Sequence, residues 1–152
     1  MARNELARCR RFGLTLAVLL LDLDYFKAIN DTYGHATGDA ALRAFVATAT
    51  AQLRARDTLG RYGGEEFLVV LPATPCEDAR ATAERLRAAV AGTTLEAGGH
   101  RLRVTTSIGV AEAAGNDGID AVLARADTAL YQAKAQGRNR TAAASPNLTP
   151  TR

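Results

Sequence analysis

RYGGEEFLVVLP, residues 61–72, is the most informative segment of this chain, because it joins a glycine pair and an acidic pair directly to an apolar run. Gly63 and Gly64 are typical of a tight turn between two strands. A turn alone does not require the carboxylates of Glu65 and Glu66. Their presence raises the question of which other charged residues the chain brings to this turn.

The segments around the turn predict a β-hairpin next to a central strand. Residues 58–62 and 66–71 have the composition of two short strands, with the acidic pair at or beside the hairpin tip. Residues 14–21 are apolar on both faces, which indicates a strand covered on each side. If the hairpin pairs with this strand, Glu65 and Glu66 lie near Asp22, at its exit.

The remaining periodicity predicts helices and further strands. We expect helices over residues 4–12, 25–31, 39–54, 77–91 and 119–136, and a loop at 33–39. Residues 94–104 contain a Gly98-Gly99 turn, and residues 105–111 are expected to form another strand. Asp24 is expected to cap the second helix, and Gly137 to end the last one. This order predicts an α+β fold with an antiparallel-rich central sheet flanked by helices. Residues 1–144 are expected to form one domain and residues 145–152 a disordered tail.

Composition excludes several classes of protein. The chain has 152 residues, 47% of them hydrophobic, and a net charge of only +3, so a nucleic-acid partner or membrane contact by this domain is not expected. Basic residues before LTLAVLLL imitate a signal peptide, but the apolar run stops at Asp22 and is too short to span a bilayer. Cys9 and Cys76 are expected to be free thiols in a cytoplasmic domain.

Residues 19–31, LLLDLDYFKAIND, carry the first candidate site. Asp22 and Asp24 are two apart at a strand end, so both can point to one side, and Lys27 lies in the helix that follows. Helix N-termini bind phosphate oxygens, and Mg²⁺ prefers a few carboxylates together with phosphate. A simpler interpretation remains open, in which Asp24 is only a helix cap and Asp22 only a polar residue at the strand end.

Several motifs together resemble the GGDEF family, the diguanylate cyclases. GGEEF at residues 63–67 matches the signature in its glutamate variant, and further segments match in the family's order. They are DLDYFKAINDTYGHATGD (22–39), RARDTLGRYGGEEF (54–67), TTSIGVA (105–111) and ADTALYQAKAQGRNR (126–140). The resemblance covers residues 14–140. It implies a fold like that of nucleotidyl cyclases and polymerase palms, with a ferredoxin-like core.

The resemblance also implies an activity. Family members condense two GTP molecules into cyclic di-GMP and release two pyrophosphates, as homodimers in which each subunit holds one GTP. Two Mg²⁺ ions per active site, with Mn²⁺ as an alternative, would be bound by Asp22, Glu65 and the carbonyl of Leu23. Glu65 or Glu66 would assist deprotonation of the ribose 3′-OH, and the sequence leaves that division open.

The same resemblance assigns substrate-binding residues. The triphosphate would be held by Lys27, by the amides of Phe26 and Lys27, and by Lys134 and Arg138. Gly63 and Gly64 would let the substrate approach the backbone. Asn30 and Asp39 would read guanine, whose N1–H and N2–H donors suit a carboxylate or amide. Without the resemblance, simpler interpretations hold for Asn30 as a helix-terminal residue and for Asp39 as a helix cap.

A second site is implied by RARD, residues 54–57. It resembles the family's RxxD inhibitory motif, which lies five residues before the GGEEF signature and binds the product cyclic di-GMP. Arg54 would stack on a guanine of the product and donate paired hydrogen bonds to its acceptor edge. Asp57 would accept hydrogen bonds from guanine N1–H and N2–H. Arg85 matches the position of an additional arginine that contributes to this site in the family. An isolated Arg-x-x-Asp pair is otherwise a common surface ion pair of little weight.

Two further expectations complete the sequence interpretation. The chain begins after the DxLTGLxNR-like segment with which family domains usually start, so we expect a truncated domain end and an upstream sensory or receiver domain in the full-length protein. A catalytically silent module that binds cyclic di-GMP through Arg54 and Asp57 is the alternative to an active cyclase. A pure interaction domain would leave the acidic cluster unexplained.

Overall fold

β1 (Leu16–Leu23) is the central strand of a five-stranded sheet in this computed structural model, which describes residues 2–144. The strand order is β2-β3-β1-β6-β7, and all neighbours are antiparallel except β6 and β7. The other elements are α1 (Ala2–Arg11), α2 (Phe26–Tyr33), α3 (His35–Thr50), β2 (Thr58–Gly63), β3 (Glu66–Pro72), α4 (Cys76–Gly92), β4 (Thr94–Ala97), β5 (His100–Arg103), β6 (Thr106–Glu112), α5 (Ile119–Ala135) and β7 (Thr141–Ala143). This confirms the α+β prediction.

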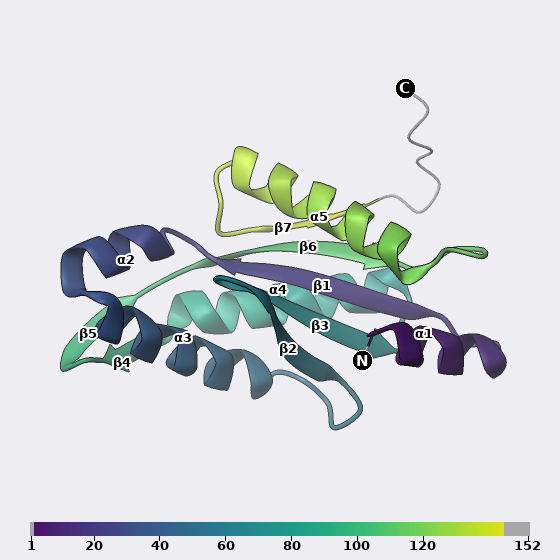
Figure 1. Cartoon of the computed structure of the whole chain (residues 1–152), viewed down its shortest axis with the longest axis horizontal. Helices are drawn as coiled ribbons and strands as arrows, with labels where there is room; N and C mark the ends of the chain where they lie inside the picture. Colours follow the sequence, from purple (N-terminus) through teal and green to yellow (C-terminus); the bar gives the residue numbers. More distant parts are fainter. Residues whose placement is uncertain (1, 145–152) are drawn as a thin grey trace.

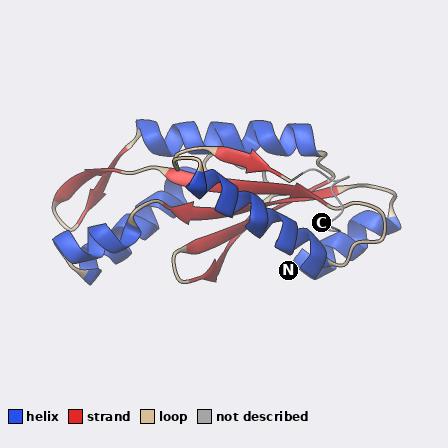
Figure 2. Ribbon diagram, turned by 90° about the horizontal axis from the view of Figure 1, so that it is seen from above, coloured by secondary structure: helices blue, strands red, loops and turns tan. Residues whose placement is uncertain are grey.

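Helices cover both faces of the sheet (Figures 1 and 2). Side chains of β1 alternate between the faces: Leu19 and Leu21 join the core beneath α3 and α4, while Val18 and Leu20 join the core beneath α1 and α5. All eight residues of β1 are buried, as expected of a central strand. The alternation places Asp22 on the α5 side, where it emerges at the end of the strand.

The predicted hairpin pairing is confirmed. β2 and β3 pair around the turn, and β3 pairs with β1 so that Glu66 lies opposite Asp22. Gly137 also ends α5 as expected: it has φ +125°, and the amides of Gly137 and Arg138 bond back to the carbonyls of Lys134 and Ala133. The two cysteines are free.

Three sequence expectations were wrong. Residues 33–39 are not a loop, because α3 begins at His35. Gly38 lies inside this helix for close packing: a Cβ there would stand 1.7 Å from Oδ1 of Asn30. β1 continues to Leu23 and so contains Asp22, and Asp24 makes no cap bond, the cap position of α2 being Tyr25. The short parallel strand β7 was not expected.

Two observations delimit what the structure describes. Residues 145–152, expected to be a tail, lie outside the described residues, so that prediction and the domain limits stay predictions. Within residues 2–144 no helix combines the length and apolarity that crossing a membrane requires.

Candidate active site

A cavity of about 270 Å³ opens where β1 ends and α2 begins. Its walls come from four places in the sequence: the exit of β1, the first turn of α2, the hairpin tip and the end of α5. It is lined by Asp22, Leu23, Asp24, Tyr25, Phe26, Lys27, Ala28, Glu65, Lys134 and Arg138. Seven of these had been singled out from the sequence, so the fold brings the predicted metal-binding and phosphate-binding groups together.

The hairpin tip carries the acidic pair to this cavity. The register between β2 and β3 shifts between Arg61 and Gly63, and Gly64 has φ +50°, a conformation that favours glycine. Nε of Arg61 donates a 2.8 Å hydrogen bond to the carbonyl of Gly64, which fixes the turn. Glu65 consequently lines the cavity, while Glu66 starts β3 beside Asp22. Gly63 and Gly64 lie at the turn rather than in the cavity wall.

Asp22 is buried and only partly satisfied. Its Oδ2 contacts the ammonium of Lys134, whereas its Oδ1 is buried with no hydrogen-bond partner among the described residues. Burial raises the pKa of Asp22, the bond and charge of Lys134 oppose the shift, and the charge of Glu65 adds to it. Burial also raises the pKa of Glu66, and the charge of Asp22 raises it further. Asp22 and Glu66 therefore lie close enough for their negative charges to repel each other.

These residues fit a Mg²⁺ site of the predicted kind. No group of three His, Cys, Asp or Glu side chains gathers as a metal cage in residues 2–144. Mg²⁺ is commonly held by one or two carboxylates plus substrate phosphates, so Asp22 and Glu65 match its needs. The unpartnered Oδ1 of Asp22 is an oxygen with free lone pairs beside the cavity.

Three cations surround the same cavity. They are Lys27, Lys134 and Arg138. Lys27 is exposed, and its Nζ lies 3.3 Å from Oδ2 of Asp31. The guanidinium of Arg138 lies 4.9 Å from the ring centroid of Tyr25, a cation–π contact. Positive groups that converge beside two carboxylates suit a ligand that carries both phosphates and a divalent ion.

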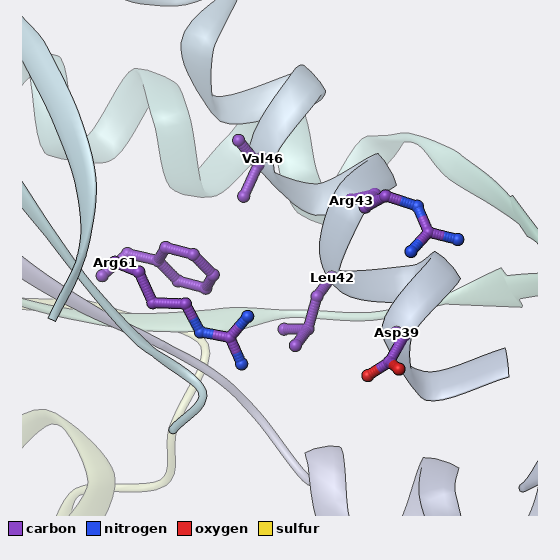
Figure 3. A pocket seen from close by; sticks show the side chains of 6 residues that line it. Asp39, Leu42, Arg43, Val46 and Arg61 are labelled. Atoms are coloured by element: carbon purple, nitrogen blue, oxygen red, sulfur yellow. The ribbon is translucent and has the colours of Figure 1, made fainter. Parts of the chain in front are cut away.

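The predicted guanine-reading residues do not share one cavity. Asp39 lines a second cavity of about 420 Å³ with Leu42, Arg43, Val46, Arg61 and Phe67. Figure 3 shows one face of α3 and the guanidinium of Arg61 turned toward this cavity. Asn30 lies against Gly38, and its Oδ1 is buried without a partner among residues 2–144. Asn30 lines neither this cavity nor the one beside Asp22, because its side chain is packed between α2 and α3.

Arg54, Asp57 and Arg85 lie at the other end of α3, away from both cavities. Oδ2 of Asp57 accepts a 2.9 Å bond from the Arg54 amide and lies 3.5 Å from Nε of Arg54. Arg54 also donates to Thr74, and Arg85 donates to the carbonyl of Gln52. The pair is therefore formed as a local turn, with Arg54 half-exposed and Asp57 Oδ1 unpartnered in the described chain.

Sequence reasoning missed the structural roles of Asp24, Tyr25 and Arg61. The sequence suggests only a helix cap for Asp24. In the structure its carboxylate instead accepts a hydrogen bond from the Ser107 hydroxyl of β6. Its two-residue spacing from Asp22, which puts both side chains on one side, was the available signal. Arg61 stands two residues before the glycines, and its bond to the Gly64 carbonyl had no sequence signal. The contact between the Tyr25 ring and the Arg138 guanidinium could not be predicted from the sequence, because the two residues are far apart along the chain and meet only in the tertiary fold.

The chain is similar to known proteins in sequence and in fold. A family model described as "Diguanylate cyclase, GGDEF domain" matches residues 1–140. Diguanylate cyclase DgcP of Pseudomonas aeruginosa is 45% identical over 90% of this chain, and response regulator PleD of Caulobacter vibrioides is 49% identical over 84%. The chain spans 20% and 29% of the lengths of these relatives. The solved active GGEEF domain of a diguanylate cyclase from Vibrio cholerae superimposes with a TM-score of 0.86 at 33% identity, covering 94% of this chain and 91% of that one.

Proposed function

Because the chain belongs to the GGDEF family of diguanylate cyclase domains, we propose that it condenses two GTP molecules into cyclic di-GMP and releases two pyrophosphates. One observation carries the proposal. Carboxylates from β1 and the hairpin tip, and cations from α2 and α5, line a single cavity. That combination suits phosphoryl-transfer chemistry, in which positioning and electrostatic stabilisation do most of the work.

The residues of the cavity divide into metal-binding and phosphate-binding groups. Asp22, Glu65 and the Leu23 carbonyl hold the divalent ions, two Mg²⁺ per active site or Mn²⁺ in their place. When bound, the ions neutralise phosphate charge and favour ionisation of the attacking hydroxyl. The triphosphate is bound by Lys27, Lys134 and Arg138, and by the amides of Phe26 and Lys27 at the start of α2.

The attacking group is the ribose 3′-OH of the other GTP. Its proton passes to a carboxylate at the hairpin, either Glu65 or Glu66. Both are placed for this role, because Glu65 lines the cavity and Glu66 starts β3 beside Asp22. Since each cavity holds one GTP, the reaction needs two subunits with their cavities facing, which makes the active species a homodimer.

Guanine is read beside α3. The exposed carboxylate of Asp39 is an acceptor for guanine N1–H and N2–H, and Asn30, on the neighbouring helix α2, is the second residue that reads the base. Gly63 and Gly64 leave the hairpin tip open to the nucleotide, because no side chain projects from either residue.

Cyclic di-GMP inhibits its own synthesis at Arg54 and Asp57, with Arg85 as the helper. The half-exposed guanidinium of Arg54, held beside Asp57, supports this assignment. The chain acts within a longer bacterial protein in the cytoplasm, under an upstream sensory or receiver domain. Its partial coverage of DgcP and of the response regulator PleD supports such an arrangement.

The decisive test is chromatographic detection of cyclic di-GMP after incubation with GTP and Mg²⁺. Wild type should form product, and Glu65→Gln should lower the rate by at least about a hundredfold, since charge stabilisation by one group contributes that much. Glu77→Gln, an exposed glutamate on α4, is the matched control.

Other outcomes discriminate between the functions. No product from wild type, together with binding of cyclic di-GMP that Arg54→Ala removes, would favour the silent receptor. Full activity of Glu65→Gln would contradict the metal-site assignment.

A further inference from the structure

Asp24 is a buried carboxylate that joins three segments of the chain. Its Oδ1 accepts a 2.7 Å hydrogen bond from the Ser107 hydroxyl. Its Oδ2 accepts bonds from the Thr105 hydroxyl at 2.7 Å and from the backbone amide of Asn139 at 3.0 Å. The exit of β1, the start of β6 and the turn after α5 are thereby fastened at one point.

The turn after α5 is a segment that needs such fastening. Arg138 and Asn139 have φ values of +63° and +48°, in the left-handed region that costs free energy for residues other than glycine. Such conformations persist when surrounding contacts hold them. Here four hydrogen bonds hold them. The Arg138 amide donates to the Ala133 carbonyl and the Asn139 amide donates to Asp24, while Arg87 donates to Oδ1 of Asn139 at 2.7 Å and Nε of Arg140 donates to the Arg138 carbonyl at 3.1 Å.

The conformation of this turn decides where Arg138 points. Its guanidinium lies over the ring of Tyr25, at 4.9 Å from the centroid, and the residue lines the cavity with Lys134 and Glu65. Tyr25 is itself left-handed, with φ +59°. Two residues in costly conformations therefore meet at one edge of the proposed triphosphate site.

We propose that Asp24 is a positioning residue for triphosphate binding, acting through the Asn139 amide to hold Arg138 at the cavity. The inference rests on the proposed function and assigns Asp24 a role different from that of Asp22. Both oxygens of Asp24 already accept hydrogen bonds, whereas Asp22 keeps an unpartnered oxygen within residues 2–144. Two acidic residues of one motif thus serve different purposes: Asp22 faces the ligand, and Asp24 fastens the turn that presents a cation to it.

The test compares Asp24→Asn with Ser107→Ala. The asparagine is nearly isosteric but replaces the charged acceptor of the Asn139 amide, while Ser107→Ala removes one bond to Asp24 and leaves the bond to the turn. We expect Asp24→Asn to raise the KM for GTP about tenfold, with a change in kcat of less than about threefold. Ser107→Ala should change KM less than about twofold, and Asp120→Asn, an exposed carboxylate on α5, should leave both constants unchanged.

A double-mutant cycle separates positioning from general support of the fold. If Asp24 acts through Arg138, the Asp24→Asn substitution should have almost no further effect on KM in an Arg138→Ala background. Multiplicative losses in the double variant would overturn the proposal. So would an unchanged KM in Asp24→Asn.

Two measurements test the inference without turnover. Calorimetric binding of inorganic triphosphate should weaken in Asp24→Asn, and amide hydrogen exchange should accelerate at residues 137–140 but not in the middle of α5. If wild type forms no cyclic di-GMP, the proposed function fails while these measurements still test Asp24. If Asp24→Asn does not fold, hydrogen exchange of the Asn139 amide in the wild-type protein tests the proposal instead. Protection from exchange as strong as in α5 would support it. Exchange as fast as that of an exposed amide would refute it.

Discussion

Glu66 and Asp22 lie opposite each other on neighbouring strands. Their like charges therefore destabilise the metal-free protein, even though the ammonium of Lys134 contacts Asp22. The folded protein holds their protons more tightly than the unfolded chain, because burial raises both pKa values. By linkage, such groups reduce stability as pH rises above the unfolded values of 3.8 and 4.5.

Glu66→Gln should therefore stabilise the metal-free protein at neutral pH. We expect a small gain in Tm, at most about 2 °C, because solvent screens this partly exposed carboxylate and about 1 kcal/mol would shift Tm by only about 2–4 °C in a chain of this size. The gain should fade as pH falls below 4.5, the unfolded value, because the glutamate then becomes protonated in both states. Thermal melts in chelator from about pH 3.5 to 8 measure it, with Glu77→Gln as the control. An equal gain at every pH would refute the charge explanation.

Arg54 carries a prediction about regulation. Arg54→Ala should weaken binding of cyclic di-GMP about tenfold or more, since bonds from a charged group are the strong ones. It should leave the initial rate of synthesis unchanged, because Arg54 lines neither cavity. Calorimetry and a product-inhibition curve measure the two effects, and Arg56→Ala, an exposed arginine in the same turn, is the control. Equal inhibition of wild type and Arg54→Ala would remove the inhibitory assignment.

Among the elements, β6 and α5 approach closely because of Gly109. A Cβ at Gly109 would lie 2.2 Å from the Ala126 carbonyl and 2.4 Å from the Leu130 amide, both backbone atoms of α5. Since Lys134 lies in the last turn of α5 and Arg138 in the turn that follows it, the distance between β6 and α5 also affects the position of these two cations.

Gly109→Ala should lower stability by about 1–3 kcal/mol, because backbone atoms cannot move aside as a flexible side chain would. Denaturant unfolding measures the loss, and α5 should also show faster hydrogen exchange. Gly92→Ala is the control: it has open space around its Cβ position and no positive φ. Unchanged stability of Gly109→Ala would mean that α5 shifts without cost.

For the whole molecule, the proposed chemistry requires two copies. At concentrations below the dimer dissociation constant, doubling the protein should raise the total rate about fourfold, because dimer concentration follows the square of monomer concentration. Sedimentation and initial rates over the same concentrations measure this, with Glu65→Gln as an inactive subunit that should still associate. A rate strictly proportional to protein would contradict the homodimer.

Most of the fold could be predicted from local pattern. The buried central strand, the hairpin around Gly63 and Gly64, and the helix stop at Gly137 depend on side-chain periodicity and on glycine conformations, which are properties of neighbouring residues. The start of α3 was misjudged because Gly38 has the composition of a loop, whereas its role is contact with Asn30 from another helix.

The sequence by itself determined the family, the order of most elements and the list of candidate charged residues for the proposed chemistry, since these depend on motifs and their spacing. Only the tertiary structure decided how those residues divide between sites. The cavity collects residues from β1, α2, the hairpin and α5, and it leaves Asp39 in a separate one. It also decided that Asp24 fastens a distant turn instead of capping its own helix, because hydrogen bonds to Thr105, Ser107 and Asn139 exist only once the strands and α5 have packed.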